Sequence, residues 1–186
     1  MEAAERLLVR EGHRAVGVNA VAAECGVDKV LIYRYFGGLP QLLERLGERQ
    51  RLWPALGEHA AEAPSLDAAL SRSLLAMARE LRESPLLREA TLWEGTDANP
   101  FTDGLAATRE SEMEDLLEAL RSRFRVPHYL DVQALVALLA AGLLHLSTRP
   151  TESAKLFGID PASDADWQRL EKMTASITRV LAGPAD

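Results

Sequence analysis

The chain has 186 residues, a formal net charge of −7 and one cysteine. One cysteine excludes an intrachain disulfide framework and fits a reducing compartment, and 47% hydrophobic with 26% charged residues is typical of a globular protein. We expect a cytoplasmic protein of one or two domains, because no secretory signal precedes the helical pattern that begins at Glu2.

Hydrophobic periodicity predicts helices almost throughout the chain, and the first three are short. The first covers residues 2–11 and ends at Gly12, which tolerates the left-handed backbone of a helix C-cap. The second covers residues 18–24. The third covers residues 29–35 and follows Asp28, whose carboxylate can accept a hydrogen bond from an amide of the first turn.

The tight turn Cys25-Gly26-Val27 joins the second and third helices into a helix-turn-helix. In this motif the second of the two helices enters the major groove of DNA, while the first crosses the backbone. Ile32 and Phe36 share the face that we expect in the core. Cys25 has a small side chain that fits a buried place in the turn, and this is favoured over a redox sensor because no second cysteine exists.

The opposite face of the third helix combines basic, aromatic and apolar side chains. An ordinary solvated surface is the alternative interpretation, but a Val-Leu pair beside Lys, Arg and Tyr is unusual on such a surface. Lys and Arg suit phosphate or guanine, a tyrosine hydroxyl suits phosphate, and Val or Leu suits a thymine methyl group. These residues are Lys29, Val30, Leu31, Tyr33 and Arg34.

The acidic charge of the chain lies outside this segment. Residues 1–51 hold eight Lys or Arg and seven Asp or Glu, whereas the remainder carries a net charge of −8. A segment of net charge +1 is only weakly basic. Neutralisation of DNA phosphates would therefore be local rather than global.

Further helices are predicted after residue 38. The first of them starts near Leu39 and should end or bend near Leu52-Trp53, because Pro54 removes an internal hydrogen bond and clashes with the preceding turn. Ser84-Pro85 gives the combination of a cap and a first-turn proline that opens a helix. The predicted ranges are 66–83, 85–93, 101–124, 128–148 and 163–181.

The helix predicted over residues 128–148 is the most apolar in the chain. From Ala134 to Leu146 only Gly142 and His145 interrupt the apolar run, which is too short to span a bilayer. A helix that is apolar on all sides must be buried on all sides, and in a small domain this indicates a partner chain. The last two helices of each subunit could then form a four-helix bundle.

Residues 3–46 resemble the DNA-binding head of the tetracycline-repressor (TetR) family. The resemblance covers about a quarter of the chain and is specific, because glycines, core apolar residues and a Tyr-x-Tyr-Phe ending occur at fixed offsets. The matching residues are Ala3-Ala4, Leu8, Glu11-Gly12, Ala15, Val18, Val21-Ala22, Gly26-Val27, Tyr33-Arg34-Tyr35-Phe36 and Leu42.

Three places depart from the family pattern. A Thr/Ser pair usually precedes the second helix, where this chain has Val16-Gly17. Small Gly-Thr residues tend to follow the helix-3 lysine, where this chain has Val30-Leu31. The family usually has a phosphate-binding lysine at the start of its fourth helix, where this chain has Gly38-Leu39-Pro40 and no lysine. We therefore expect weaker and more salt-sensitive operator binding than is usual in the family.

The resemblance implies an all-α homodimer in two parts: a helix-turn-helix head over residues 1–46, and a helical ligand-binding and dimerisation domain over residues 47–186. Its implied partners are double-stranded DNA with a palindromic operator and a small, largely apolar effector. The implied DNA-binding residues are Gly17, Val18, Asp28, Lys29, Val30, Leu31, Tyr33, Arg34, Tyr35 and Leu39. The candidate ligand-binding residues are Met77, Trp93, Phe101, Met113, Leu117 and His145.

Each ligand candidate has a plainer alternative. Met and aromatic residues at helical spacing are usually core, and His145 within an apolar run is more often a hydrogen-bonded core histidine than a ligand contact. An acidic cluster in the helix over residues 101–124 is interpreted as a solvated face rather than a metal site, because no histidine lies at ligand spacing. Its members are Glu110, Glu112, Glu114, Asp115 and Glu118.

The sequence contains no hydrolase elbow, phosphate loop or metalloprotease motif, so it predicts no catalytic residue, no cofactor and no metal. Two hypotheses remain. One is a homodimeric, ligand-responsive transcriptional regulator, most simply a repressor that its ligand releases from DNA. The other is a small-molecule-binding dimer whose DNA-binding head has weakened, as the departures at Val16-Gly17 and Gly38-Leu39-Pro40 suggest.

Overall fold

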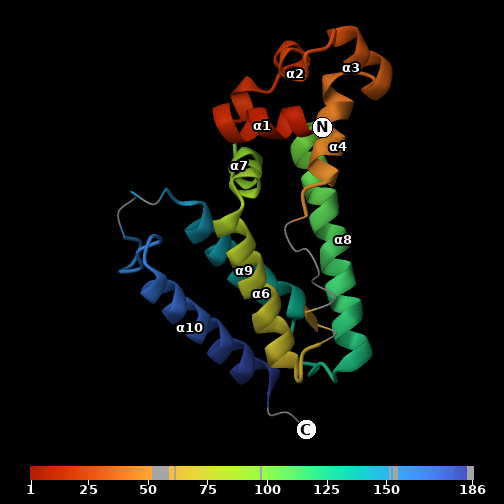
Figure 1. The fold of residues 1–186 in the computed structure, drawn as a ribbon. Helices are drawn as coiled ribbons and strands as arrows, with labels where there is room; N and C mark the ends of the chain where they lie inside the picture. The colour runs from red at the N-terminus through yellow and green to blue at the C-terminus, as the bar shows by residue number, and fades with distance from the viewer. Residues whose placement is uncertain (52–58, 61, 97, 151, 153–154, 184–186) are drawn as a thin grey trace. The chain divides into compact units, whose positions relative to one another are not determined.

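A computed structural model describes residues 1–51, 59–60, 62–96, 98–150, 152 and 155–183. Over these ranges the fold is helical, and its only β-type pairing is an isolated bridge between Leu156 and Ile159 (Figure 1). The helices are α1 (Glu2–Glu11), α2 (Val18–Cys25), α3 (Lys29–Phe36), α4 (Leu39–Glu48), α6 (Leu66–Glu83), α7 (Pro85–Glu94), α8 (Pro100–Arg123), α9 (Val132–Thr148) and α10 (Asp164–Ala182), with a short 3-10 turn, η1 (His13–Ala15), after α1. The prediction of an all-α chain is confirmed.

The ends of the helices follow from local chemistry. The Asp28 carboxylate accepts a hydrogen bond from the Val30 amide at 2.8 Å and starts α3. The Ser84 hydroxyl accepts one from the Leu87 amide at 3.2 Å, and Pro85 occupies the first turn of α7. These two helices begin where the sequence signals placed them.

Helix α9 begins later than the sequence predicted. The expected start at His128 is wrong, because the Leu130 amide bonds the Pro127 carbonyl in a turn that precedes the helix. Asp131 is the N-cap, and its carboxylate accepts a hydrogen bond from the Ala134 amide at 2.9 Å. The sequence signal for this start is Asp131 itself, because Asp is a preferred N-cap residue just before an apolar helical run.

Helix α4 ends at Glu48, earlier than the predicted end near Leu52-Trp53. Proline therefore does not stop it, since Pro54 lies six residues further on and outside the described residues. The last turn is held instead by Gln50, which is 5% exposed and donates a side-chain hydrogen bond to the Leu46 carbonyl at 3.1 Å.

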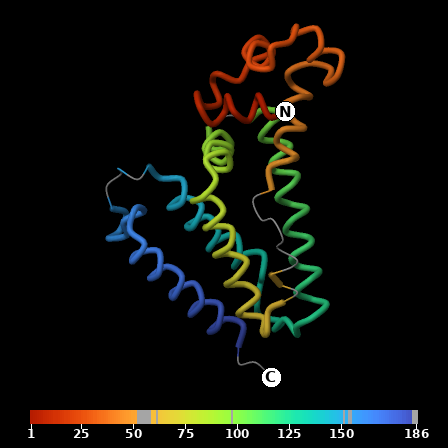
Figure 2. Tube along the Cα trace, in the orientation of Figure 1, coloured from red at the N-terminus to blue at the C-terminus, as the bar shows by residue number. Residues whose placement is uncertain are grey.

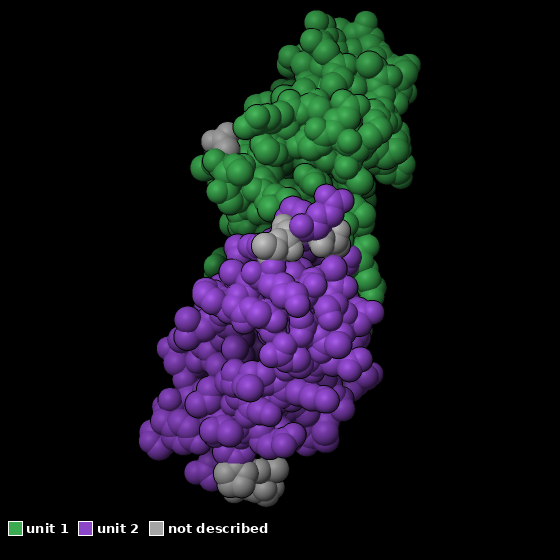
Figure 3. Space-filling view, turned by 90° about the vertical axis from the view of Figure 1, so that its left-hand side faces the viewer, with its two compact units in different colours: residues 1–52, 83–111 green, residues 53–82, 112–186 purple. Residues whose placement is uncertain are grey.

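The described chain forms two compact units, coloured separately in Figure 3. Unit 1 contains Met1–Leu52 and Glu83–Ser111, and unit 2 contains Trp53–Arg82 and Glu112–Asp186. Helix α7 and the first half of α8 thus belong to the unit that holds the helix-turn-helix, although more than thirty residues separate them from it in sequence. The tube in Figure 2 shows α8 (green) beside α4 (orange). The division of functions at residue 46 stays a prediction.

An aromatic stack completes the core of unit 1. Trp93 of α7 is 6% exposed and lies between His13, at 5.5 Å between ring centroids, and Phe101 of α8, at 4.6 Å. Both Trp93 and Phe101 belong to the same buried cluster as the apolar residues of the first four helices. The cluster also contains Ala4, Leu7, Leu8, Val16, Val21, Ala22, Ile32, Leu42, Leu43, Leu46, Ala90 and Leu105.

Unit 2 buries one face of each of its helices. Met77 of α6, Leu120 of α8 and Val136 of α9 are almost fully buried. The start of α10 is fixed by Trp167, whose indole N–H donates to the Pro161 carbonyl at 2.8 Å while Arg82 stacks over its ring at 4.6 Å. The Arg82–Trp167 contact packs the start of α10 against the end of α6 within unit 2.

Replacing the central aromatic residue of unit 1 should weaken its fold. We expect Trp93→Ala to lower the free energy of unfolding by about 3–5 kcal/mol, because it empties a large buried site between His13 and Phe101. Urea denaturation followed by circular dichroism measures this. Leu92→Ala is the matched control on the same helix, since Leu92 is 44% exposed and should change the value by about 0.5 kcal/mol or less. Equal losses in the two variants would contradict this packing.

Candidate nucleic-acid interface

The helix-turn-helix is formed by α2, a tight turn and α3. Gly26 adopts the left-handed conformation with φ 66°, which lets the chain leave α2 in one residue. The Val27 amide then bonds the Ala22 carbonyl at 3.0 Å, so the turn is closed by backbone hydrogen bonds. Val21 and Ala22 of α2 and Ile32 of α3 lie in the same core cluster and fix the two helices against each other.

Helix α3 buries Ile32 in the core, and most of its other residues are exposed. Ile32 is 4% exposed, and Phe36 packs partly buried against the same core, as the periodicity predicted. The exposed fractions of Val30, Tyr33 and Tyr35 are 62%, 54% and 67%. Lys29 and Arg34 are also exposed, and Leu31 is half-buried. One short helix therefore presents two cations, two phenols and an aliphatic side chain together.

The remaining predicted DNA contacts have different surroundings. The Asp28 carboxylate is engaged as the cap of α3, which leaves its charge at the start of that helix. Val18 and Leu39 are half-buried and pack against the core. Gly17 is the extended N-cap of α2 and, lacking a side chain, leaves the first turn without a side-chain cap. At this position only backbone amides are offered to an anion.

A corner of two glycines joins α3 to α4. Gly37 and Gly38 have φ values of 90° and 138°, a region that favours glycine. The Gly37 amide bonds the Tyr33 carbonyl at 2.9 Å, and the Leu42 amide bonds the Gly38 carbonyl at 3.2 Å. The recognition face of α3 is therefore tied to α4 by a short, hydrogen-bonded connection.

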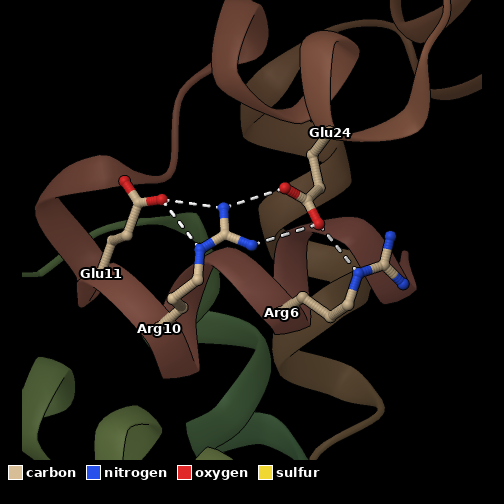
Figure 4. A network of polar contacts seen from close by, with 4 residues as sticks. All are labelled: Arg6, Arg10, Glu11 and Glu24. Atoms are coloured by element: carbon tan, nitrogen blue, oxygen red, sulfur yellow. Dashed lines mark hydrogen bonds and ion pairs between the residues drawn. The ribbon is translucent and has the colours of Figure 1, made fainter.

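Charged residues link α1 to α2 (Figure 4). Both Arg6 and Arg10 reach Glu24 at 2.9 Å, and Arg10 also contacts Glu11 at 2.8 Å. The hydrogen bonds from Arg10 and then Arg6 lower the pKa of the Glu24 carboxyl. The sequence did not reveal this cluster, because partners 14 and 18 residues apart have no characteristic spacing.

Cys25 is exposed, so the prediction of a buried cysteine is wrong. It is the last residue of α2, directly before the left-handed Gly26, so it lies at the exposed end of the helix. The apolar positions of α2 that do enter the core are Val21 and Ala22, three and four residues earlier.

The candidate ligand residues do not share one unit. Trp93 and Phe101 belong to the core of unit 1, whereas Met77, Met113, Leu117 and His145 belong to unit 2. Within unit 2, Met77 is fully buried, Leu117 is 8% exposed and Met113 is half-buried. His145 is exposed, so the alternative of a core histidine is wrong: it lies on the outer side of α9.

One small cavity of about 150 Å³ lies in unit 2 beside the end of α8. It is lined by Leu117, Leu120, Arg121, Val126 and residues 130–133. Its volume is about half of the roughly 300 Å³ at which ligand pockets begin. This cavity alone would hold only a very small molecule.

The acidic residues of α8 are exposed except for one. Glu112 is 1% exposed, so the interpretation of the whole cluster as a solvated face is wrong at that position. It lies on the inner side of α8, one turn before the buried Leu116. No group of three or more His, Cys, Asp or Glu side chains is placed to hold a metal ion within the described residues. No helix in the same part of the chain is long and apolar enough to cross a membrane.

The geometry defines the class of protein: a helix-turn-helix fold with an exposed recognition helix, followed by further helices. Residues 1–46 match the model of the family described as bacterial regulatory proteins, tetR family. The match covers about a quarter of the chain, so residues 1–46 are similar to the DNA-binding head of that family. No curated protein sequence matches the chain.

Solved structures with the same fold extend over nearly the whole chain. The TetR-family regulator PfmR of Thermus thermophilus is 21% identical, with a TM-score of 0.59, and the match covers 100% of this chain and 94% of that one. FadR of Bacillus subtilis, solved in complex with stearoyl-CoA, is 15% identical, with a TM-score of 0.65 and coverages of 100% and 97%. The Dietzia repressor AlkX, implicated in biodegradation of n-alkanes, is 19% identical, with a TM-score of 0.54 and coverages of 97% and 91%.

The Glu24 cluster should make the stability of the head depend on pH. Because folding lowers the Glu24 pKa below its usual 4.5, the ion pairs stabilise the fold fully above that pH and are lost as the pH falls through the lowered pKa. We expect Glu24→Gln to reduce the melting temperature at neutral pH, and the difference from wild type to shrink below about pH 4.5. Thermal unfolding at a series of pH values measures both.

The matched control is Glu11→Gln, which removes the other carboxylate of the cluster. Glu11 is half-exposed and pairs with one arginine, Arg10, among the described residues, whereas Glu24 joins two arginines of α1 to α2. Glu11→Gln should therefore have the smaller effect. A Glu24→Gln difference that stays constant down to low pH would show that the carboxylate does not stabilise the head through its charge.

Proposed function

We propose that this protein is a cytoplasmic, homodimeric repressor that binds a palindromic DNA operator and leaves it when a small, largely apolar ligand binds. Residues 1–46 bind the DNA, and residues 47–186 provide dimerisation and ligand binding. The observation that carries the proposal is the exposed face of α3 in a tetR-type head.

The chemistry of that face fits a major groove. Arg34 and Lys29 are exposed cations that can bind phosphate or guanine. Tyr33 and Tyr35 are more than half exposed and offer hydroxyl groups to phosphate oxygens. Val30 is 62% exposed, and a protruding aliphatic side chain suits the methyl group of thymine. The operator should therefore contain thymine opposite Val30.

Phosphate binding outside α3 is sparse. The N-termini of α2 and α4 follow Gly17 and Gly38 and lack side-chain caps, so hydroxyl or lysine contacts to the backbone are missing there. This feature favours a second candidate function, a ligand-binding dimer with a weakened DNA-binding head. Measurement of DNA binding by the wild-type protein separates the two functions.

Helices α9 and α10 supply the surface for dimerisation. Leu138 on α9 and Val180 on α10 are 76% and 78% exposed in the single chain, and Met173 is 58% exposed. A methyl group placed on Gly142 would meet no atom within 4 Å, so another helix can approach α9 closely at this point. Exposed aliphatic side chains on two long helices are the elements of a four-helix bundle between two copies.

The choice of ligand class rests on the helices of unit 2 and on the similar structures. The buried faces of the unit 2 helices in this chain are mainly apolar, as at Met77, Leu117 and Val136, and such faces suit an apolar ligand. FadR of Bacillus subtilis was solved with stearoyl-CoA, and AlkX is implicated in biodegradation of n-alkanes. Acyl chains, from short to long, are therefore the first ligands to test.

The DNA-binding proposal is tested by footprinting the region upstream of the protein's own gene at low salt. We expect two protected half-sites with centres about one helical turn apart. Arg34→Ala should weaken binding about tenfold or more and, if Arg34 contacts phosphate, should reduce the slope of log affinity against log salt by about one. Tyr33→Ala should weaken binding in the same direction. Fluorescence anisotropy across a salt series measures these effects.

Two exposed residues away from α3 serve as controls for these variants. Tyr129→Ala removes a tyrosine that is 63% exposed in unit 2, and Arg49→Ala removes an exposed arginine beyond the end of α4. Both should bind like wild type. Absence of any protected site at low salt would reject the repressor in favour of the weakened-head alternative.

The ligand proposal predicts release of the protein from its operator by an acyl chain. Stearoyl-CoA should lower the bound fraction in a concentration-dependent manner, because a ligand that binds the released form better shifts the population toward it. Coenzyme A alone and stearate alone are the controls that separate recognition of the headgroup from recognition of the chain. Unchanged operator binding with acyl chains of short, medium and long length would reject this ligand class.

A further inference from the structure

Helices α4 and α8 approach each other within unit 1 at a pair of glycines. A methyl group on Gly47 would collide with the Phe101 carbonyl oxygen and lie 2.9 Å from the Leu105 amide nitrogen. A methyl group on Gly104 would collide with the Glu44 carbonyl oxygen and lie 3.0 Å from the Glu48 amide nitrogen. The two backbones are therefore in direct contact, and each glycine faces the backbone of the other helix.

Bonds and packing on both sides hold this crossing together. The Thr108 hydroxyl, one turn after Gly104, lies 3.1 Å from the carbonyl oxygen of Glu48, the last residue of α4. Leu46 of α4 and Leu105 of α8 lie in the same buried cluster. Because the atoms in contact are backbone atoms, no side chain can rotate to let one helix shift along the other.

The recognition helix α3 is attached to the N-terminal end of α4, and Gly47 lies near the C-terminal end of α4. Gly37 and Gly38 form the hydrogen-bonded corner between α3 and α4, and the Arg45 guanidinium of α4 lies over the Phe36 ring at 5.9 Å to its centroid. Ile32 of α3 shares its core cluster with Leu42 of α4. A change in the position of α4 therefore moves the exposed face of α3.

We propose that Gly47 and Gly104 are positioning residues for DNA recognition: the backbone contacts that they allow between α4 and α8 fix α4, and through it α3, to the first half of α8. The inference rests on the proposed DNA-binding function and adds α8 to the elements that determine operator affinity.

The test compares Gly104→Ala and Gly47→Ala with Gly95→Ala. A methyl group on Gly95 would lie 3.6 Å from the nearest atom, the Leu92 carbonyl oxygen, which is an ordinary contact. Affinities for the footprinted operator and for a scrambled duplex are measured by anisotropy at a temperature where circular dichroism shows each variant folded. The ratio of the two affinities separates positioning from loss of folded protein, which lowers both.

We expect Gly104→Ala and Gly47→Ala to lower operator affinity about tenfold or more and affinity for scrambled DNA by about twofold or less. Contacts to base edges need the correct placement of both α3 helices, whereas nonspecific phosphate contacts tolerate displacement. Gly95→Ala should keep the wild-type ratio. Folded Gly104→Ala and Gly47→Ala variants with a wild-type ratio would overturn the inference.

Thr108 gives a second measurement that keeps the volume nearly constant. The Thr108 hydroxyl lies 3.1 Å from the Glu48 carbonyl oxygen and also 3.1 Å from the Gly104 carbonyl oxygen of its own helix, so it is shared between the two. Thr108→Val removes it and should lower the affinity ratio about two- to tenfold. Thr108→Ser keeps the hydroxyl and should restore the ratio. If the glycine variants do not fold, an unchanged ratio in Thr108→Val overturns the inference. If the wild-type protein binds no operator, the proposed function fails first and the inference falls with it.

Discussion

The recognition helix of this protein is eight residues long, and a helix of that length is not stable alone in water. Its conformation depends on the burial of Ile32 in a core that α1, α2 and α4 share. The capping bond from Val30 to Asp28 and the left-handed turns at both ends add local support. Ile32 is buried and Phe36 is partly buried, whereas the face that carries Val30, Tyr33 and Arg34 is exposed.

That core is not formed by the head sequence alone. Trp93 and Phe101, which come from α7 and α8, stack beneath the first helices, and the glycine crossing of α4 and α8 brings two backbones into contact. Evidence from packing thus places α7 and the first half of α8 with the DNA-binding elements.

Large apolar side chains are exposed on two helices of unit 2. The aliphatic side chains Leu138, Met173 and Val180 protrude from α9 and α10, and covering them by a second copy would remove apolar surface from water. Dimerisation would also place two α3 helices for the two halves of a palindromic site. The acidic charge of the later residues and the nearly neutral head leave DNA affinity to a few local contacts.

The sequence by itself determined the all-α fold, most helix bounds and the helix-turn-helix, because these follow from periodicity and from caps such as Asp28 and Ser84 that act within a few residues. It placed Ile32 inside and Val30, Tyr33 and Arg34 outside for the same reason. Only the tertiary structure decided that Trp93 and Phe101 complete the head, that Arg6 and Arg10 meet Glu24, and that Gly47 and Gly104 each face the backbone of the other helix. Those contacts join residues far apart in the chain, and local sequence patterns do not determine which helices pack together.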